Sequence, residues 1–359
     1  MTQFKTIDLR SDTLTIPDRE MLEPILSAPL GDDGRIDAHG RGEDPTVAAL
    51  ERLAAALTGK EAAALFCSGT LANMTAILTH CNPGDKVLID EHLHAYRSEG
   101  GAFDQGLGQR VPVFYPMTET FLPDTEAIGR LAAQEEPKLL CIENTHNFYG
   151  GICIPAEHLS SLRQTADMYR IPIHMDGARI FNAAEALGTS AKELCSYADS
   201  VMFCISKGLG APIGSLLCGT AEFIRKAKSL RKMLGGGMRQ AGVIAAPGIY
   251  ALEHNVERLK YDRLRAQKLG KILDSSLKYI RVQKNIQSNI IMLHTGKIPA
   301  DELCRKMEQK GVIGGAVGND MVRLVIYKGI TDQDIEDAAG RIAEAEREAA
   351  KEDLPQALV

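Results

Sequence analysis

The sequence lacks the features that would place a protein in a membrane, outside the cell or on nucleic acid. No segment approaches the roughly 18 uninterrupted apolar residues of a membrane-spanning helix, and residues 1–12 lack the apolar stretch of a signal peptide. The 41 Lys and Arg residues against 47 Asp and Glu residues leave a formal charge of −6, so there is no electrostatic attraction to a polyanion. We therefore expect a cytoplasmic protein with neither a membrane nor a nucleic-acid partner.

The cysteines also lack the spacing of a disulfide or zinc framework. No C-x-x-C pair occurs, and most of the eight cysteines lie singly inside apolar runs: Cys67, Cys81, Cys141, Cys153, Cys195, Cys204, Cys218 and Cys304. We expect reduced core thiols and no metal site. Internal repeats, low-complexity tracts and flexible linkers are absent as well, so the chain reads as globular from one end to the other.

The first half of the chain alternates short apolar runs with amphipathic stretches. The runs predict strands at residues 62–67, 86–90, 139–143, 171–176, 200–206 and 215–218. The amphipathic stretches predict helices at residues 46–57, from 70 onward, at 124–134 and near 157–169. Short buried strands separated by helices are typical of an α/β fold with a mostly parallel sheet that is covered on both faces.

The second half changes character. Residues 221–268 read as helical, interrupted only by Gly235-Gly236-Gly237 and by Pro247. Further strands are predicted at residues 279–282, 289–293 and 322–326, between helices. We therefore expect a large domain at residues 1–255 and a smaller α+β domain at residues 256–359.

A lysine, Lys207, follows the predicted strand at 200–206 and precedes two glycines. Burial and nearby cations favour the neutral form of an amine, which is the form that condenses with an aldehyde. The alternative is a lysine at a strand end that reaches for water, and this segment alone does not decide between the two.

Asp176 ends another buried strand and precedes Gly177 and Arg179. Open α/β sheets bind ligands at the carboxyl ends of their strands, and a carboxylate buried there needs a partner. In a pyridoxal phosphate site that partner is the protonated pyridine nitrogen, which makes the ring an electron sink. An aspartate that caps the next helix and pairs with Arg179 is the ordinary alternative. The presence of Lys207 further along the chain favours the cofactor.

The third segment joins a strand to a helix through Ser68, Gly69 and Thr70. Backbone N–H groups at a helix N-terminus bind phosphate, and a glycine allows close approach. By itself the signal is weak, because Ser-Gly-Thr is also a common helix-capping turn.

In this order, these segments resemble the threonine aldolase family, a branch of the beta-eliminating lyases. The resemblance covers most of the chain, and its motifs are residues 8–13 (DLRSDT), 42–46 (GEDPT), 68–70 (SGT), 143–147 (ENTHN), 176–179 (DGAR), 206–212 (SKGLGAP), 235–242 (GGGMRQAG) and 322–325 (VRLV). The runs around Lys207 and at 235–240 are specific, whereas GEDPT alone is not. The resemblance implies the fold type I of pyridoxal-phosphate-dependent transferases and a carbon–carbon lyase.

The family also implies a role for each matching residue. Lys207 would hold pyridoxal 5'-phosphate as a Schiff base, Asp176 would pair with the pyridinium, and His94, five residues before Glu99, would stack on the ring. The remaining roles are phosphate binding by Gly69 and Thr70, substrate carboxylate binding by Ser11, Arg179 and Arg323, contact with the phosphate region by Lys232 and Arg239, and proton transfer at the substrate hydroxyl by His146. Since Lys232 and Arg239 act partly across subunits in relatives, a homo-oligomer, typically a dimer of dimers, is implied.

The chain departs from the family pattern around the expected substrate. Arg41 replaces a usual tyrosine, Tyr327 stands near the place of a usual histidine, and His146 is followed by the bulky Phe148 and Tyr149. These differences bear on which β-substituent is accepted.

The expected reaction is retro-aldol cleavage of a β-hydroxy-α-amino acid to glycine and an aldehyde. Other reactions of the same cofactor, namely β-elimination, racemisation or transamination, are the main alternative, because fold does not fix function. A cofactor-binding regulator is a further alternative, although no DNA-binding module precedes Ser11. His92 and His94 could instead lie on one side of an extended segment and bind a metal, but no third ligand is evident.

Overall fold

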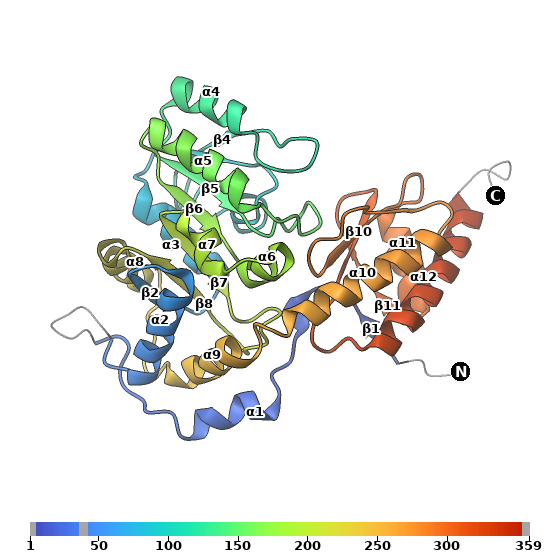
Figure 1. Cartoon of the computed structure of the whole chain (residues 1–359), viewed down its shortest axis with the longest axis horizontal. Coiled ribbons are helices and arrows are strands. Elements are labelled where there is room, and N and C mark those ends of the chain that lie inside the picture. The colour runs from blue at the N-terminus through green and yellow to red at the C-terminus, as the bar shows by residue number, and fades with distance from the viewer. Residues whose placement is uncertain (1–4, 36–41, 354–359) are drawn as a thin grey trace. The chain divides into compact units, whose positions relative to one another are not determined.

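A computed structural model of the chain describes residues 5–35 and 42–353 (Figure 1). Contacts divide the chain into two compact units, which are described separately. The larger consists of Ile16–His146 and Cys153–Glu257, and the smaller of Met1–Thr15, Asn147–Ile152 and Arg258–Val359. The division into domains at residues 1–255 and 256–359 stays a prediction.

The larger unit is built on a seven-stranded sheet. Its strands, in spatial order, are β2 (Ala62–Phe66), β8 (Ser215–Gly219), β7 (Ser200–Cys204), β6 (Ile173–Asp176), β5 (Leu139–Glu143), β3 (Lys86–Ile89) and β4 (Val111–Phe114). The neighbours from β7 to β4 are parallel, and β8 runs antiparallel to both β7 and β2. The mostly parallel sheet is therefore confirmed, with one antiparallel strand.

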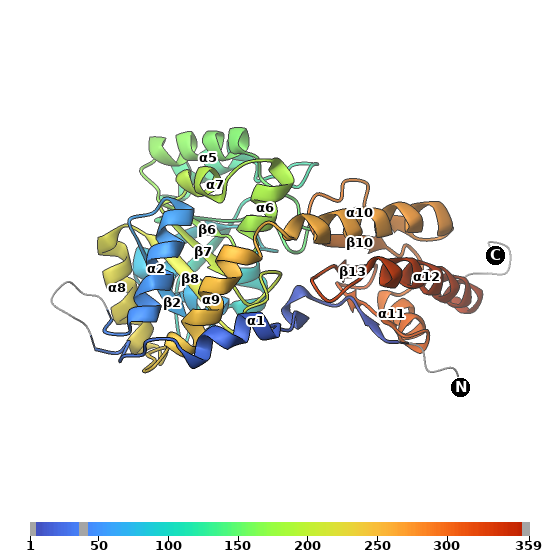
Figure 2. The same ribbon diagram turned by 60° about the horizontal axis from the view of Figure 1, so that its bottom comes forward.

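Helices lie on both sides of this sheet (Figures 1 and 2). Alternate residues of the strands face opposite ways: Phe66 and Met202 belong to an apolar cluster with α3 and α8, while Phe203 packs edge-on against Phe181 of α6. The helices are α1 (Arg19–Leu22), α2 (Pro45–Thr58), α3 (Gly69–His80), α4 (Thr125–Glu135), α5 (Ala156–Met168), α6 (Ile180–Leu187), α7 (Ala191–Ser196), α8 (Ala221–Met233) and α9 (Gly242–His254), with short helical turns η2 (Glu23–Leu26) and η3 (Ala95–Glu99).

Two features of the larger unit differ from the sequence analysis. Pro247 does not interrupt the helical region but lies inside α9, which continues through it without the backbone hydrogen bond that a proline cannot donate. Strand β4 was not expected, because it is an edge strand whose end residues, Val111 and Phe114, are exposed and which contains Pro112.

In its described residues, the smaller unit contains a four-stranded antiparallel sheet, a two-stranded parallel pair and three helices. The sheet has the order β12 (Gly315–Ala316), β13 (Met321–Val325), β10 (Ile290–His294) and β9 (Arg281–Val282), and β1 (Ile7–Asp8) pairs with β11 (Val312–Ile313). The helices are α10 (Leu259–Ser276), α11 (Ala300–Gln309) and α12 (Asp332–Asp353), and the turn η1 covers Asp12–Leu14.

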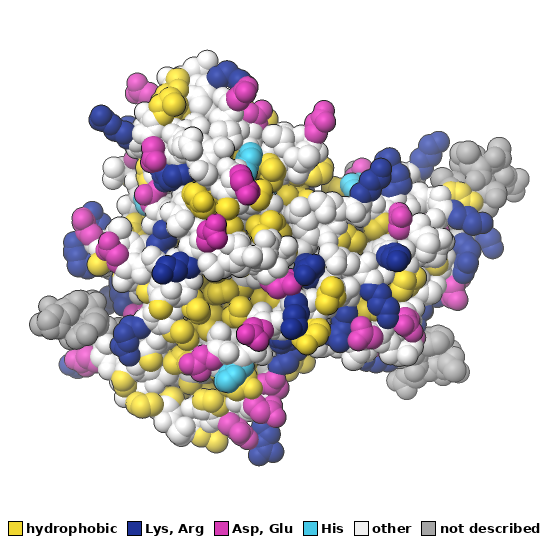
Figure 3. Space-filling model, in the orientation of Figure 1, with side chains coloured by type: hydrophobic (Ala, Val, Ile, Leu, Met, Phe, Trp, Pro, Cys, Tyr) yellow, Lys and Arg dark blue, Asp and Glu magenta, His cyan; other side chains and the backbone are white. Residues whose placement is uncertain are grey.

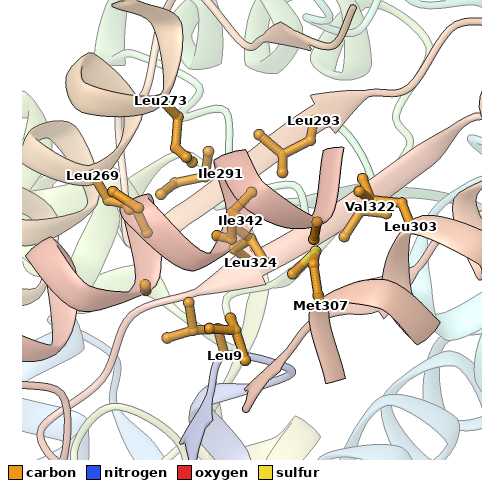
Figure 4. Close-up of a cluster of buried hydrophobic side chains, with 14 of the residues drawn as sticks. Leu9, Leu269, Leu273, Ile291, Leu293, Leu303, Met307, Val322, Leu324 and Ile342 are labelled. Atoms are coloured by element: carbon orange, nitrogen blue, oxygen red, sulfur yellow. The ribbon is translucent and has the colours of Figure 1, made fainter. Parts of the chain in front are cut away.

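The core of the smaller unit is an apolar cluster that these elements share. Figure 4 shows Leu269 and Leu273 of α10, Ile291 and Leu293 of β10 and Leu324 of β13 pointing toward one another. Leu9, just after β1, belongs to the same cluster, which explains why the N-terminal segment packs with the C-terminal part of the chain.

Within the described residues, no helix combines the length and the hydropathy needed to cross a membrane. The eight cysteines are free thiols, as the sequence analysis expects.

Candidate active site

The carboxyl ends of six strands of the larger unit lie at one edge of its sheet. Strands β3, β4, β5, β6 and β7 are parallel, and two antiparallel steps through β8 give β2 the same direction. Most of the predicted site residues of this unit follow directly from these ends, which is the usual place for a ligand in such sheets.

Asp176 is the last residue of β6 and is only 2% exposed. Its Oδ1 accepts a hydrogen bond from the Ala178 N–H at 2.9 Å, and its Oδ2 accepts one from Asn73 Nδ2 at 2.8 Å. The backbone contact closes a turn before α6, whereas the second partner is a side chain on α3. The carboxylate is therefore buried with a hydrogen-bond donor on each oxygen, a state in which its charge is tolerated.

His94 precedes the turn η3 and lies beside this carboxylate. Its Nδ1 is 3.0 Å from Glu99 Oε1, and its backbone N–H donates to Glu143 Oε2 at 2.8 Å. Burial lowers the pKa of His94, but the hydrogen bond to Glu99 and the charges of Asp176, Glu143 and Glu99 outweigh it, so that the pKa is raised. The hydrogen bond to Glu99, five positions later, thus orients the ring of His94, whose stacking on a cofactor stays a prediction.

His94, Glu99 and Asp176 also form a group whose donor atoms all lie within 4.8 Å of one another. Such a group can in principle hold a metal ion. Here, however, the amide nitrogen of Asn73 donates to Asp176 and also to Glu99, at 2.8 and 3.2 Å. His92, the second histidine of the metal hypothesis, contacts Arg97 and is not in the group. The hydrogen bonds of this group therefore favour a set of paired carboxylates over the metal site that was considered as an alternative for His92 and His94.

His146 lies three residues beyond β5 and is buried. Its Nε2 is 3.0 Å from Asp90 Oδ2, and Asp90 directly follows β3. Glu143, at the end of β5, has a raised pKa because burial disfavours its charge more than His146 favours it. His146 is predicted from the sequence, whereas Asp90 is not, although its position at a strand end was an available signal.

Lys207 follows β7 and is half-buried. It lines a small cavity together with Arg179, Asn182 and Cys204. Burial raises the pKa of the Cys204 thiol, and the positive charges of Lys207 and Arg179 oppose that rise, which places both cations near Cys204. The amine of Lys207 therefore belongs to a lined cavity of the larger unit.

Gly69 and Thr70 begin α3, and Ser68 caps the helix by accepting from the Leu71 N–H. A Cβ atom at Gly69 would lie 2.8 Å from Met202 Cε and 3.0 Å from Cys204 Sγ, so a larger residue there would require these side chains to shift. The first N–H groups of a helix have no acceptor within the helix and are available to an anion.

Lys232 and Arg239 flank the glycine run and are exposed. A Cβ atom at Gly236 would lie 2.3 Å from Leu71 Cδ2, so this run packs on the first turn of α3. Arg239 forms an ion pair with Asp32 at 3.1 Å.

Ser11 and Arg323 belong to the smaller unit. Ser11 caps η1 and accepts hydrogen bonds from Thr13, and Arg323 on β13 donates to Asn147 Oδ1 at 2.9 Å. Tyr327 is buried in the smaller unit, whereas Arg41 lies outside the described residues.

Residues 8–295 match the beta-eliminating lyase family model. The chain belongs to this family. It is 39% identical to the low specificity L-threonine aldolase of Escherichia coli, over 93% of this chain and 97% of that one. It is 36% identical to low-specificity L-threonine aldolase 1 of Arabidopsis thaliana, over 92% and 94%.

Solved structures show the fold of this lyase. The threonine aldolase of Leishmania major superposes with a TM-score of 0.78 at 16% identity, covering 96% of this chain and all of that one (100%). The serine palmitoyltransferase of Sphingomonas wittichii gives 0.75 at 18% identity, covering 98% and 89%. The predicted fold type I of pyridoxal-phosphate-dependent enzymes is thereby confirmed.

Proposed function

We propose that this lyase is a pyridoxal-phosphate-dependent aldolase that cleaves L-threonine, L-allo-threonine or a related β-hydroxy-α-amino acid to glycine and an aldehyde. The observation that carries the proposal is one sheet edge with a buried Asp176 and with His94 and Glu99 within 4.8 Å of it. Lys207 follows the neighbouring strand β7 at the same edge. The relatives from Escherichia coli and Arabidopsis thaliana, which match nearly the whole chain, are threonine aldolases.

The side chains of the larger unit fit pyridoxal 5'-phosphate. The bound cofactor would supply an electron sink for the electrons of the broken bond. The Lys207 amine would bind its aldehyde carbon, Asp176 would pair with its ring nitrogen, and the His94 imidazole would stack on its ring. The N–H groups of Gly69 and Thr70 would bind the phosphate, with Lys232 and Arg239 reaching the same region.

His146 and Asp90 are suited to handle the proton of the substrate hydroxyl. The hydrogen bond of 3.0 Å between them fixes the orientation of the buried imidazole. A carboxylate beside such a ring stabilises the positive charge that the ring gains when it accepts a proton. We infer that His146 takes the β-hydroxyl proton, or orients the water that does, while Asp90 holds the ring.

The substrate carboxylate would bind to arginine. Arg179, which is 5% exposed, lies with Lys207 around the small cavity, and a guanidinium can bind both oxygens of a carboxylate. Ser11 and Arg323 are proposed as further ligands from the family resemblance.

We also propose a homo-oligomer, a dimer of dimers, in the cytoplasm. Figure 3 shows hydrophobic side chains gathered over α2 and α9, where a groove is lined by Pro24, Ala49, Ala246, Ile249 and Tyr250 among others. Apolar surface of this kind is characteristic of protein interfaces. Sedimentation of the purified protein measures the oligomeric state.

The test is a substrate comparison with two products measured. Threonine, allo-threonine and phenylserine are each expected to give glycine and an aldehyde, with the Lys207→Ala variant as the control without activity. Serine, cysteine and alanine report β-elimination, racemisation or transamination. If no β-hydroxy amino acid yields an aldehyde, the proposed function is wrong.

A further inference from the structure

A chain of hydrogen bonds leads from Asp176 through the interior of the larger unit to the end of α3. Asn73 Nδ2 lies 2.8 Å from Asp176 Oδ2, and Asn73 Oδ1 lies 3.2 Å from His174 Nε2. His174 Nδ1 lies 2.9 Å from Ser200 Oγ, which lies 2.8 Å from His80 Nε2. The aldol chemistry proposed above does not use Asn73, His174, Ser200 or His80.

The two carboxylates at one end fix the direction of every bond in this chain. Because ionised carboxylates only accept, both amide hydrogens of Asn73 point outward, one to Asp176 and one to Glu99 at 3.2 Å. The Asn73 carbonyl must then accept from a protonated His174 Nε2, which leaves Nδ1 to accept from the Ser200 hydroxyl. Ser200 in turn accepts from His80 Nε2. The tautomer of each histidine thus follows from the position of the carboxylates.

Burial supports this assignment because it keeps both imidazoles neutral. Burial lowers the pKa of His174 to about 3, with the charge of His80 acting in the same direction and with the charge of Asp176 and a hydrogen bond to the Ser200 backbone acting against it. Burial likewise lowers the pKa of His80 to about 4, opposed by the charge of Asp199. A neutral imidazole has one donor and one acceptor, which is what each position in the chain requires.

The orientation of the Asn73 amide has a consequence at the proposed cofactor. A flipped amide would point its carbonyl oxygen at the carboxylates of Asp176 and Glu99. Both carboxylates would lose the amide N–H donor and would be repelled by the carbonyl oxygen. In the tautomer assigned above, the His174 Nε2–H donates to the Asn73 carbonyl, so a flip of the amide would also cost this hydrogen bond. Ser200 and His80 then hold the ring of His174.

We propose that Asn73 is a positioning residue that holds Asp176 against the cofactor ring nitrogen and Glu99 against His94, and that His174, Ser200 and His80 fix the Asn73 amide. This inference rests on the proposed function for the cofactor but not for the substrate or the reaction. Every hydrogen bond in this series joins side chains, which come from α3, β6, β7 and η3, so substitutions of single side chains can test it.

The first test is the affinity of the apoenzyme for pyridoxal 5'-phosphate, measured by absorbance titration without substrate. His174→Leu removes the donor to Asn73 and is expected to weaken binding about tenfold or more, the worth of one hydrogen bond to a polar group near charge. His174→Gln keeps an N–H donor and is expected to restore most of the affinity. Asn73→Ala is expected to weaken binding more than His174→Leu, because two carboxylates lose a donor.

His158→Gln is the matched control, because His158 Nε2 contacts the backbone oxygen of Pro123 and takes no part in the chain of bonds. It is expected to leave the affinity unchanged. If His174→Leu binds pyridoxal 5'-phosphate as tightly as the wild type and His158→Gln, the positioning role is wrong.

The second test needs no variant to fold. Nitrogen-15 NMR of the wild-type apoenzyme is expected to show His174 and His80 as neutral rings protonated at Nε2. A His174 ring protonated at Nδ1 would overturn the inference. Wild-type protein that binds no pyridoxal 5'-phosphate would contradict the proposed function. The NMR result would still decide which atoms donate and which accept in the chain of hydrogen bonds.

Discussion

Both units of the molecule bury carboxylates, but they use them differently. In the smaller unit, Glu346 accepts from the backbone N–H groups of Lys278, Tyr279 and Ile280 and so fastens α12 to the segment before β9. In the larger unit, Asp176 and Glu99 share the side-chain amide of Asn73 and lie beside His94. A buried acid that meets only backbone donors stabilises the chain, whereas buried acids grouped with a histidine at a sheet edge indicate chemistry.

Removing the charge of Asp176 should have the largest effect of any change in the larger unit. We expect Asp176→Asn to lower kcat on the order of 10³-fold, the scale of losing a preorganised electrostatic group, with little change in folding. Asp124→Asn is the matched control, because Asp124 caps α4 by accepting from the Ala127 N–H and asparagine caps equally well. Steady-state kinetics of both variants checks this, and equal loss in both would contradict the role of Asp176.

In the smaller unit, where apolar packing dominates, we expect a substitution to lower the stability of the fold. Leu269→Ala, in the buried cluster of Figure 4, should lower the free energy of unfolding by about 3 kcal/mol. Leu264→Ala, on the same helix but 50% exposed, should change it by less than about 0.5 kcal/mol. Urea unfolding followed by circular dichroism measures both, and similar values for the two variants would show that the cluster does not stabilise the unit.

His146 and Asp90 test whether the buried pair in the larger unit acts as one. Replacing His146 by Gln should reduce kcat about 10²-fold while bound cofactor colour stays unchanged. If Asp90 acts only through this ring, adding Asp90→Asn to His146→Gln should cost little more than His146→Gln alone. Steady-state kinetics of the two single variants and the double variant measures this. Fully additive losses would show that His146 and Asp90 act independently.

Acid should affect the two units in opposite directions. His174 has a pKa of about 3 in the folded chain, below the ordinary value of 6.5, so between these values the unfolded chain binds more protons and stability falls with falling pH. Asp262, in the smaller unit, has a pKa raised by burial to about 6, so acid relieves its burial and favours folding.

His174→Gln should therefore remove about 2 kcal/mol of the stability lost between pH 7 and pH 5. Urea unfolding at both pH values measures this change, with His158→Gln as the control. An unchanged pH dependence in His174→Gln would contradict a neutral buried ring.

Much of the fold was predictable, and the reason is that buried strands carry their signal locally. The runs that became β3, β5, β6 and β7 are apolar and bounded by turns, so each could be identified without its neighbours. The edge strand β4 carries exposed ends and Pro112, and β1 pairs with a strand near the other end of the chain, so neither has a local signal.

The site was predictable only where a residue carries its chemistry alone. Lys207, Asp176 and His94 follow strand ends or match family motifs, and their roles remain predictions. Asn73 and Asp90 were not identified, because their importance comes from partners 103 and 56 positions away in sequence, Asp176 and His146. Only the folded chain brings such partners together.

We propose that one amine of the larger unit, that of Lys207, binds the cofactor. Reduction of the purified holoenzyme with borohydride, followed by peptide mapping, identifies the amine that does so. We expect the visible absorbance of the cofactor to be lost on reduction and the pyridoxyl label to be found on Lys207. A label on another lysine, or an unlabelled chain, would show that this role of Lys207 is wrong.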